Sequence, residues 1–251
     1  MKDVTLIIQG KISQESLDFY IENYPTLNVI VSTWVDNTLD LSKLPTSYRV
    51  VTQSTPHNSG FQNQNYQFVS TINGLRLANT KFVIKIRGDE YYSNIEYIYS
   101  EIVKNPDKIH CSPIFFRHWS FMNYHISDHI IAGTLDNLTL MFTSTKSKVD
   151  AGTIFHVTDG KIHSYWEPEI NLTRGYLMEK ERCRFGIVDG RNLMVDNFNI
   201  LDVKQMEPYL IVANIFSTTW RKNFIPEENY SISDVKKLFL DKEAVYDTDI
   251  T

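Results

Sequence analysis

Short apolar runs that alternate with segments of helical spacing constrain the fold of this chain more than any other feature. The runs at residues 4–8, 27–33 and 82–86 are each too short for a buried helix and end in polar residues. Apolar residues at the i, i+3, i+4, i+7 spacing of a helix face occur between them, at residues 17–24 and 68–75. This alternation predicts a mostly parallel sheet with helices on its faces, which is an α/β fold.

A further short strand of the first half is expected at residues 49–52. The second half of the chain is less regular. The elements expected in the second half are a strand at residues 110–115, a hairpin of residues 152–158 and 161–165, a helix at residues 168–183, a strand at residues 209–212 and a helix at residues 234–240. Neither repeats nor a linker interrupt the pattern, so one domain over residues 1–251 is predicted.

Composition narrows the function classes. The 251 residues are 42% hydrophobic, which is enough for a sizeable core, and the formal net charge of −5 does not favour a nucleic-acid partner. The two cysteines, Cys111 and Cys183, lack the spacing of metal ligands and cannot staple a domain of this size. Because the N-terminal apolar run is too short for a signal peptide and no segment reaches the length of a membrane span, a cytoplasmic protein is expected.

Polar residues stand where three of the expected strands end. They are Gln9 and Gly10, residues 32–36, and residues 87–90. In open parallel sheets, ligands bind beyond the carboxyl ends of the strands. The sequence therefore predicts a ligand site at this edge of the sheet.

The turn after residues 82–86 carries the residues most suited to bind a phosphorylated ligand. Alternation along the strand places Lys85 and Arg87 on one face, and Arg87 offers a planar set of donors for phosphate. Gly88 allows the backbone to approach a ligand closely. Asp89 and Glu90 are hard oxygen ligands of the kind that hold Mg²⁺ or Mn²⁺ with substrate phosphates.

Two other interpretations of this turn exist. Asp89 or Ser93 could cap the helix that begins near Asn94. The Arg-Gly-Asp tripeptide of adhesion ligands needs an exposed loop, whereas here it directly follows a buried strand.

Six short blocks of the sequence resemble those of a known family. The blocks IIQGKI, IVSTW, NQNYQFVSTINGLRLA, KIRGDEY, ISDHIIAG and PEINLTRGYL occur in this order between residues 4 and 179. Together they resemble the WavE lipopolysaccharide-synthesis family of glycosyltransferases. The resemblance implies a GT-A fold, in which a Rossmann-like sheet binds a nucleotide-sugar, usually with a divalent metal at an Asp-x-Asp motif.

The resemblance assigns roles to individual residues. Asp89 and Glu90 would bind Mn²⁺ or Mg²⁺, although Tyr91 stands where the motif has its second acid. Three alternatives follow: Asp89 alone meets the metal, Glu90 helps it, or no metal is needed. Gln67 would also reach the donor. The predicted nucleotide-sugar site comprises Gln9, Gly10, Thr33, Trp34, Asp36, Asn65, Lys85 and Arg87. Trp34 would stack on the base or, as an alternative, fill the core.

A transferase of the inverting kind also needs a carboxylate base near the acceptor hydroxyl. The candidates are Asp128 and, at the start of the helix expected at residues 168–183, Glu169 or Glu167. Asp128 is placed ahead of Glu169 because it follows an aromatic-rich stretch suited to sugars. His129 is a candidate third metal ligand, and so is His156 or His163. The alternative for each of them is an ordinary, partly buried histidine.

These observations predict a glycosyltransferase that moves a sugar from a nucleotide-sugar to a glycan acceptor with the help of a divalent metal. Residues 1–105 would bind the donor, residues 106–200 would carry the acceptor site and the catalytic residues, and residues 201–251 would form an extension. The alternatives are a sugar-phosphate nucleotidylyltransferase and a non-catalytic carbohydrate- or nucleotide-binding module. Contact with a membrane surface, the oligomeric state, the identities of donor and acceptor, the inverting or retaining outcome and the metal dependence are left open.

Overall fold

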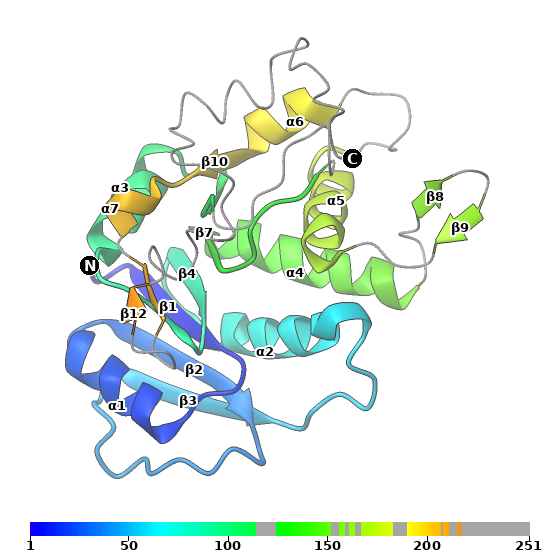
Figure 1. Cartoon of the computed structure of the whole chain (residues 1–251). Coiled ribbons are helices and arrows are strands. Elements are labelled where there is room, and N and C mark those ends of the chain that lie inside the picture. Colours follow the sequence, from blue (N-terminus) through cyan, green and yellow to red (C-terminus); the bar gives the residue numbers. More distant parts are fainter. Residues whose placement is uncertain are drawn as a thin grey trace, which may run out of the picture.

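A seven-stranded sheet in the order β10-β6-β7-β4-β1-β2-β3 runs through the molecule (Figure 1). The computed structural model describes residues 1–113, 124–151, 156–158, 161–163, 167–182, 190–206, 208–210 and 215–216. The strands are β1 (Val4–Gln9), β2 (Asn28–Trp34), β3 (Tyr48–Gln53), β4 (Phe82–Arg87), β6 (Ile109–Cys111), β7 (Ile130–Thr134) and β10 (Phe198–Ile200). Only β7 runs antiparallel to its neighbours in this sheet, β4 and β6. The predicted mixed, mostly parallel sheet with flanking helices is therefore confirmed.

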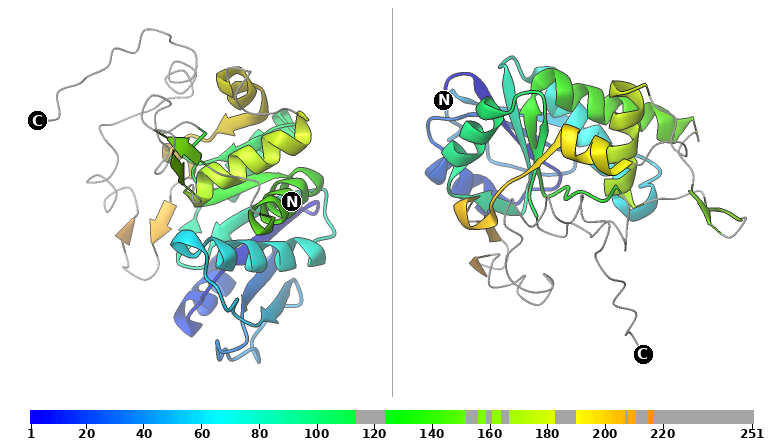
Figure 2. Two further views of the ribbon diagram at one scale, coloured as in Figure 1. Left: turned by 90° about the vertical axis from the view of Figure 1, so that its right-hand side faces the viewer. Right: turned by 90° about the horizontal axis from the view of Figure 1, so that it is seen from above.

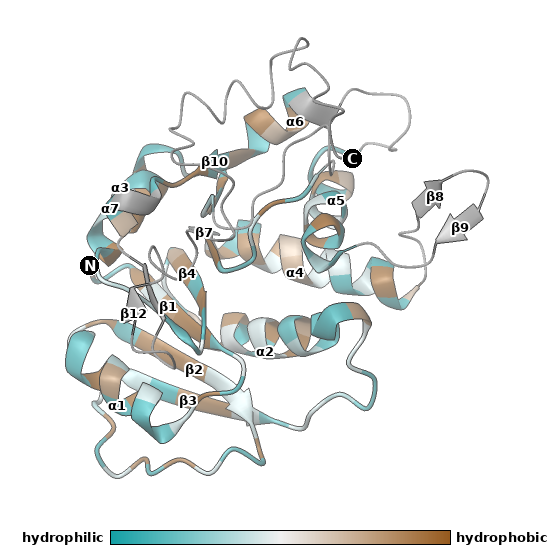
Figure 3. Ribbon diagram, viewed as in Figure 1, coloured by the Kyte–Doolittle hydropathy of each residue, from teal (hydrophilic) through white to brown (hydrophobic). Residues whose placement is uncertain are grey.

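Helices cover both faces of the sheet (Figures 1 and 2). One face packs against α1 (Gln14–Asn23) and α3 (Ile95–Lys104), and the other against α2 (Gln64–Leu77), α4 (Leu135–Asp150) and α5 (Pro168–Lys180). Figure 3 shows the central strands in brown, because they are apolar on both faces, as expected for buried parallel strands.

Alternation along β4 is as the sequence predicts. Phe82, Ile84 and Ile86 pack into the core beneath α1 and α3, whereas Val83 belongs to the core on the opposite face. Lys85 shares that opposite direction and is fully buried. The strand therefore carries a cation into the interior of the protein, where it requires partners.

The remaining elements are short. They are η1 (Phe61–Asn63), β5 (Glu90–Tyr92), β8 (His156–Thr158), β9 (Lys161–His163), α6 (Gly190–Asn197), α7 (Val203–Met206), β11 (Pro208–Leu210) and β12 (Ile215–Phe216). β5, β11 and β12 form a small antiparallel sheet, and β8 pairs with β9 as the predicted hairpin. None of the helices that the structure describes is long and apolar enough to cross a membrane.

The expected boundaries need small corrections. The helix expected at residues 168–183 ends at Lys180, and the strand expected at residues 110–115 is β6, of which residues 114–115 lie outside the described part. The strand expected at residues 209–212 is β11, and residues 211–212 lie outside the described part, as does the helix expected at residues 234–240.

The order of strands creates a topological switch point beside β1. The chain moves outward from β1 to β2 and β3, and then returns to place β4 on the other side of β1. Gln9 at the end of β1 lies opposite both Ser32 of β2 and Arg87 of β4. In open α/β sheets the crevice at such a point is where ligands bind.

Buried tyrosines of α1 hold the turn that follows β4. The hydroxyl of Tyr20 donates to the carbonyl oxygen of Glu90 at 2.5 Å, and the hydroxyl of Tyr24 donates to that of Tyr92 at 2.7 Å while accepting from the Tyr92 amide at 3.0 Å. These bonds satisfy backbone groups that leave the main sheet. They fix the backbone, and hence the direction of each side chain, from residue 87 to residue 92.

The helix-cap interpretation of this turn is wrong. Asn94 is the N-cap of α3, and its side-chain oxygen accepts from the amide of Tyr97 at 3.0 Å. Asp89 and Ser93 therefore do not supply the cap, and the acid at position 89 needs another explanation.

The contact between α4 and α5 places the beginning of α5 at the edge of the sheet. At this contact Gly175 lies directly against Thr145, and a Cβ added at position 175 would lie 2.2 Å from the Thr145 hydroxyl oxygen and 2.8 Å from its Cα. The Ser144 hydroxyl also donates to the Gly175 carbonyl oxygen at 3.3 Å. The approach of these helices therefore depends on the missing side chain.

We expect Gly175→Ala to lower the free energy of unfolding by about 1–3 kcal/mol, because overpacking outweighs the gain in helix propensity. Glu179→Ala on the exposed side of α5 removes only a surface ion pair with Lys148 and serves as the control, with a change below about 1 kcal/mol. Urea denaturation of both variants measures these changes. Equal stability of Gly175→Ala and wild type would contradict the assignment of this contact.

Candidate functional site

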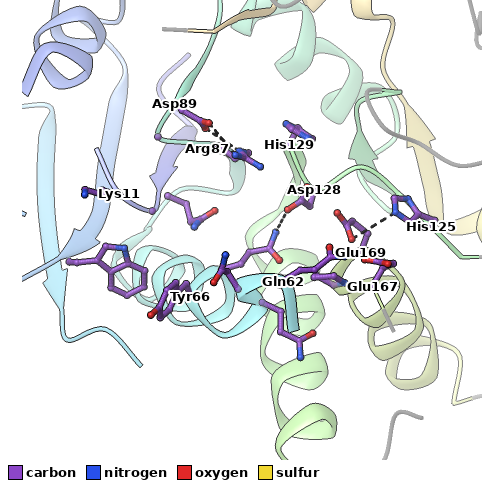
Figure 4. A pocket seen from close by; sticks show the side chains of 18 residues that line it. Lys11, Gln62, Tyr66, Arg87, Asp89, His125, Asp128, His129, Glu167 and Glu169 are labelled. Carbon is purple, nitrogen blue, oxygen red and sulfur yellow. Dashed lines mark hydrogen bonds and ion pairs between the residues drawn. The ribbon is translucent and has the colours of Figure 1, made fainter. Parts of the chain in front are cut away.

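A cavity of about 790 Å³ opens at the switch point. Its walls come from Trp34 and from parts of residues 9–11, 62–67, 87–89, 125–129 and 167–169. A cavity of this size is within the range of small-molecule sites. Within it, Asp128 lies between Arg87 and Glu169 (Figure 4).

Arg87 and Asp89 form a two-pronged ion pair on the cavity wall. The Nε of Arg87 donates to Oδ1 of Asp89 at 3.0 Å, and its Nη2 donates to Oδ2 at 3.1 Å. Such a fork uses both carboxylate oxygens and fixes the guanidinium plane. The side chains are 40% and 36% exposed, so the pair is in contact with solvent and not part of the core.

Gly88 brings two backbone segments together and also lines the cavity. Its amide donates to the carbonyl oxygen of Gln9 at 2.9 Å, and a Cβ at this position would lie 2.7 Å from the carbonyl oxygen of Lys11. The absence of a side chain therefore allows the loop after β1 to pack on the turn after β4. As a result, Lys11 and Arg87 belong to the same wall of the cavity.

Glu90 faces away from the cavity and is only 2% exposed. Its Oε1 lies 2.6 Å from Nδ1 of His129, and its Oε2 accepts from the hydroxyl of Tyr92 at 3.0 Å. Burial of a carboxylate requires such partners. Glu90 therefore anchors His129, which does line the cavity.

Lys85 ties the interior of β4 to Asp128. Its Nζ donates to the backbone carbonyl oxygen of Asp128 at 2.5 Å, and burial lowers the pKa of this ammonium. The Asp128 carboxylate accepts from Nε2 of Gln67 at 2.7 Å. Burial alone would raise the pKa of Asp128, but the nearby cations, Lys85 foremost, bring this pKa below its ordinary value. Asp128 is therefore an ionised carboxylate at neutral pH.

The pKa of Glu169 is shifted in the opposite direction to that of Asp128. It stands in the first turn of α5, just after Pro168, and burial together with the charge of Asp128 raises its pKa to about 7. Its Oε2 lies 3.8 Å from Nε2 of His125 and has no hydrogen-bond partner among the described residues. A carboxyl group that changes protonation near neutral pH and is not saturated with hydrogen bonds is suited to accept a proton.

The structure brings most of the predicted site residues to one cavity. The predicted residues that line it are Gln9, Gly10, Trp34, Gln67, Arg87, Asp89, Asp128, His129, Glu167 and Glu169. Trp34 is only 6% exposed and its ring centroid lies 5.3 Å from that of Tyr66, so it is both a packed aromatic and a wall residue.

The other predicted residues have different surroundings. Thr33 is buried and accepts from Nδ2 of Asn37 at 2.9 Å, and Asn65 donates to the carbonyl oxygen of Asn58 at 3.1 Å to hold the preceding loop. Asp36 is exposed, and neither Lys85 nor Glu90 reaches the cavity wall. These five residues therefore do not line the cavity.

Sequence reasoning missed several wall residues. They are Lys11, Gln62, Asn63, Gln64, Tyr66 and His125. Gln62 and Asn63 have positive φ angles of 46° and 64°, a conformation that residues other than glycine rarely adopt. Gln64 is buried and its Oε1 accepts from Nδ2 of Asn171 at 2.8 Å, which joins α2 to α5. The run of amides at the start of α2 was the available signal.

The two acids predicted to bind the divalent metal are engaged by other side chains in this structure. Both oxygens of Asp89 bind Arg87, and those of Glu90 bind His129 and Tyr92. Within the part of the chain that the structure describes, no three His, Cys, Asp or Glu side chains are grouped as metal ligands. The side chains of His156 and His163 lie outside that part.

Comparison with known proteins identifies the family. The sequence profile of the WavE lipopolysaccharide synthesis family matches residues 5–149, more than half of the chain. The chain belongs to this family. No curated protein sequence matches it.

Two of the solved structures that are similar to this WavE family member have low sequence identity to it. The galactosyltransferase LgtC, in complex with donor and acceptor sugar analogs, is 10% identical over 68% of this chain and 69% of its own, with a TM-score of 0.45. HddC from Yersinia pseudotuberculosis is 10% identical over 55% of this chain and 79% of its own, with a TM-score of 0.32. Neither likeness is close enough to carry an argument about function.

The WavE match divides the site unevenly. It includes the cavity residues from Gln9 to His129, whereas Glu167 and Glu169 lie beyond residue 149. Glu169 stands on α5, which is held at the cavity by its packing on α4 and by the hydrogen bond between Gln64 and Asn171.

We expect Glu169→Gln to stabilise the protein at pH 8 by roughly 1–3 kcal/mol and to change little at or below pH 4.5. Because the folded-state pKa of Glu169 is raised, its contribution is present in acid and is lost as pH rises through about 7. Glutamine mimics the neutral acid at every pH. Unfolding free energies from urea denaturation between pH 4 and 8.5 measure the difference.

Glu179→Gln in the same helix is the control. Lys148 lowers the pKa of Glu179, so this substitution is not expected to stabilise the protein at high pH. A difference between Glu169→Gln and wild type that is the same at every pH would contradict the raised pKa.

Proposed function

We propose that this chain is a GT-A-type glycosyltransferase that moves a sugar from a nucleotide-sugar to a glycan acceptor in the synthesis of lipopolysaccharide or a related polysaccharide. Membership of the WavE family supports the biological setting. The cavity at the carboxyl ends of β1, β2 and β4 supports a nucleotide-binding role, because such crevices accept nucleotides in other doubly wound sheets.

One observation carries the catalytic part of the proposal. Two carboxyl groups in the same cavity, Asp128 and Glu169, have pKa values shifted in opposite directions. Pairs of titratable groups whose environments separate their pKa values are typical of acid–base catalysis. Glu169 is the better base of the two, since Asp128 is held ionised by cations and already accepts from Gln67.

The donor would lie with its nucleotide toward Trp34 and its diphosphate toward Arg87. Trp34 and Tyr66 supply aromatic surface for the base, and Gln9 and Gly10 line the cavity between that surface and the turn after β4. Asp128, beyond Arg87, would accept from hydroxyl groups of the transferred sugar.

The transfer is a displacement at the anomeric carbon. An acceptor hydroxyl oxygen attacks this carbon, its proton passes to the carboxylate of Glu169, and the bond between the anomeric carbon and the diphosphate oxygen breaks. The electron pair of that bond remains on the departing diphosphate, next to Arg87. Asp128, ionised, stabilises positive charge that develops on the sugar.

Three further features belong to the same proposal. Residues 1–105 form the donor half, residues 106–200 the acceptor half and residues 201–251 an extension, in one domain. The enzyme works in the cytoplasm, where nucleotide-sugars would be its donors, and a membrane surface is one source of its acceptor. Nucleic acid is not among its partners, in line with the net charge of −5.

We expect Glu169→Gln to reduce kcat by about 10²–10⁴-fold with little change in donor binding, because a general base acts in the chemical step. Wild-type kcat should rise with pH through about 7, and the variant should lack this rise. Glu179→Gln, on the exposed side of α5, should transfer sugar at the wild-type rate.

The assay uses a panel of radiolabelled nucleotide-sugars with polysaccharide fragments as acceptors, and donor binding is measured by thermal shift. Full activity of Glu169→Gln would exclude Glu169 as the base and return that role to Asp128. If no nucleotide-sugar raises the melting temperature of wild type, the transferase proposal is wrong.

A further inference from the structure

Residues 89–91, where the family resemblance places the metal-binding motif, each have a different set of contacts in the structure. Asp89 is engaged by the guanidinium of Arg87, and Glu90 is buried against His129 and Tyr92. Tyr91, in place of the motif's second acid, is partly buried and packs against α1, with its ring centroid 5.1 Å from that of Phe19 and 4.9 Å from that of Tyr24.

The tyrosine bonds from α1 keep these directions fixed. The Tyr20 hydroxyl bonds to the carbonyl oxygens of Arg87 and Glu90, and Tyr24 bonds to the backbone of Tyr92. Rotation of the Glu90 side chain toward the cavity would break its bonds to His129 and Tyr92, and a change in the direction of the backbone would break the tyrosine bonds. The segment therefore presents a single carboxylate to the cavity, that of Asp89.

The same wall of the cavity offers cations. Arg87 and Lys11 both line it, and the contact of Gly88 with the Lys11 backbone holds their two loops together. Arginine has five N–H donors, and the fork to Asp89 uses two of them. No other described residue accepts from the remaining three, which are therefore available to phosphate oxygens, for which guanidinium is well suited.

The carboxylates around this wall are already compensated. Arg87 neutralises Asp89, the charge of Lys85 offsets that of Asp128, and Glu90 lies within hydrogen-bond distance of His129. Lys11 adds a positive charge and takes part in none of the ion pairs between described side chains. An incoming dianion therefore meets a wall whose net charge is not negative.

We propose that Arg87, assisted by Lys11, binds the donor's diphosphate directly, in the place that the family resemblance gives to a divalent cation, and that Asp89 is a positioning residue for Arg87. This inference rests on the proposed function. It assigns to side chains the charge stabilisation of the leaving group that a metal ion supplies in other enzymes.

The test measures binding of UDP, GDP, ADP and dTDP by calorimetry, each with EDTA and with Mn²⁺. For the diphosphate that binds wild type, the dissociation constant should differ by less than about 3-fold between the two conditions. Arg87→Gln should weaken binding at least 10-fold in EDTA, and Asp89→Asn should weaken it less than Arg87→Gln does. Arg76→Gln, an exposed arginine of α2 outside the cavity, is the matched control and should bind as wild type does.

Wild type alone decides the main point, so a variant that fails to fold does not leave the question unanswered. Wild-type binding that is lost in EDTA and restored by Mn²⁺ would overturn the inference and leave the transferase proposal standing. If none of the diphosphates binds wild type with or without Mn²⁺, both proposals fail.

Discussion

The buried ammonium of Lys85 is the constraint around which the site is organised. A lysine in the middle of a central strand must be compensated, and the compensation comes from the carbonyl oxygen of Asp128 and from the surrounding carboxylates. The bond to Asp128 draws the start of β7 to β4 and places the Asp128 carboxylate at the cavity. A structural requirement of the core thus fixes the position of a group that the proposed reaction uses.

The turn after β4 shows how neighbouring acids acquire different roles. Asp89 and Glu90 are adjacent in sequence, but the backbone between them is held by Tyr20, so their side chains leave in different directions. One meets the guanidinium of Arg87 at the cavity, and the other meets His129 in the interior. Because backbone direction decides which partner each carboxylate finds, a motif of two acids does not by itself define a metal site.

The electrostatic effect of Asp128 on Glu169 depends on distant parts of the chain. α5 reaches the cavity because it packs on α4 at Gly175 and because Asn171 bonds to Gln64 of α2. In this setting burial and the Asp128 charge bring the pKa of Glu169 to about 7. A glutamate at the start of an exposed helix would have only weak interactions with the helix dipole.

The sequence by itself determined the mostly parallel sheet, the helices on its faces and the edge at which polar residues gather, because hydrophobic periodicity and strand alternation are local properties. It also indicated Arg87, Asp128 and Glu169 as wall residues. Only the tertiary structure decided that Asp89 pairs with Arg87, that Glu90 turns inward, that Asn94 caps α3 and that Lys11 joins the wall. These outcomes depend on which groups meet across the fold, and hydrogen-bond partners, burial and pKa shifts are set by such long-range contacts and not by spacing along the chain.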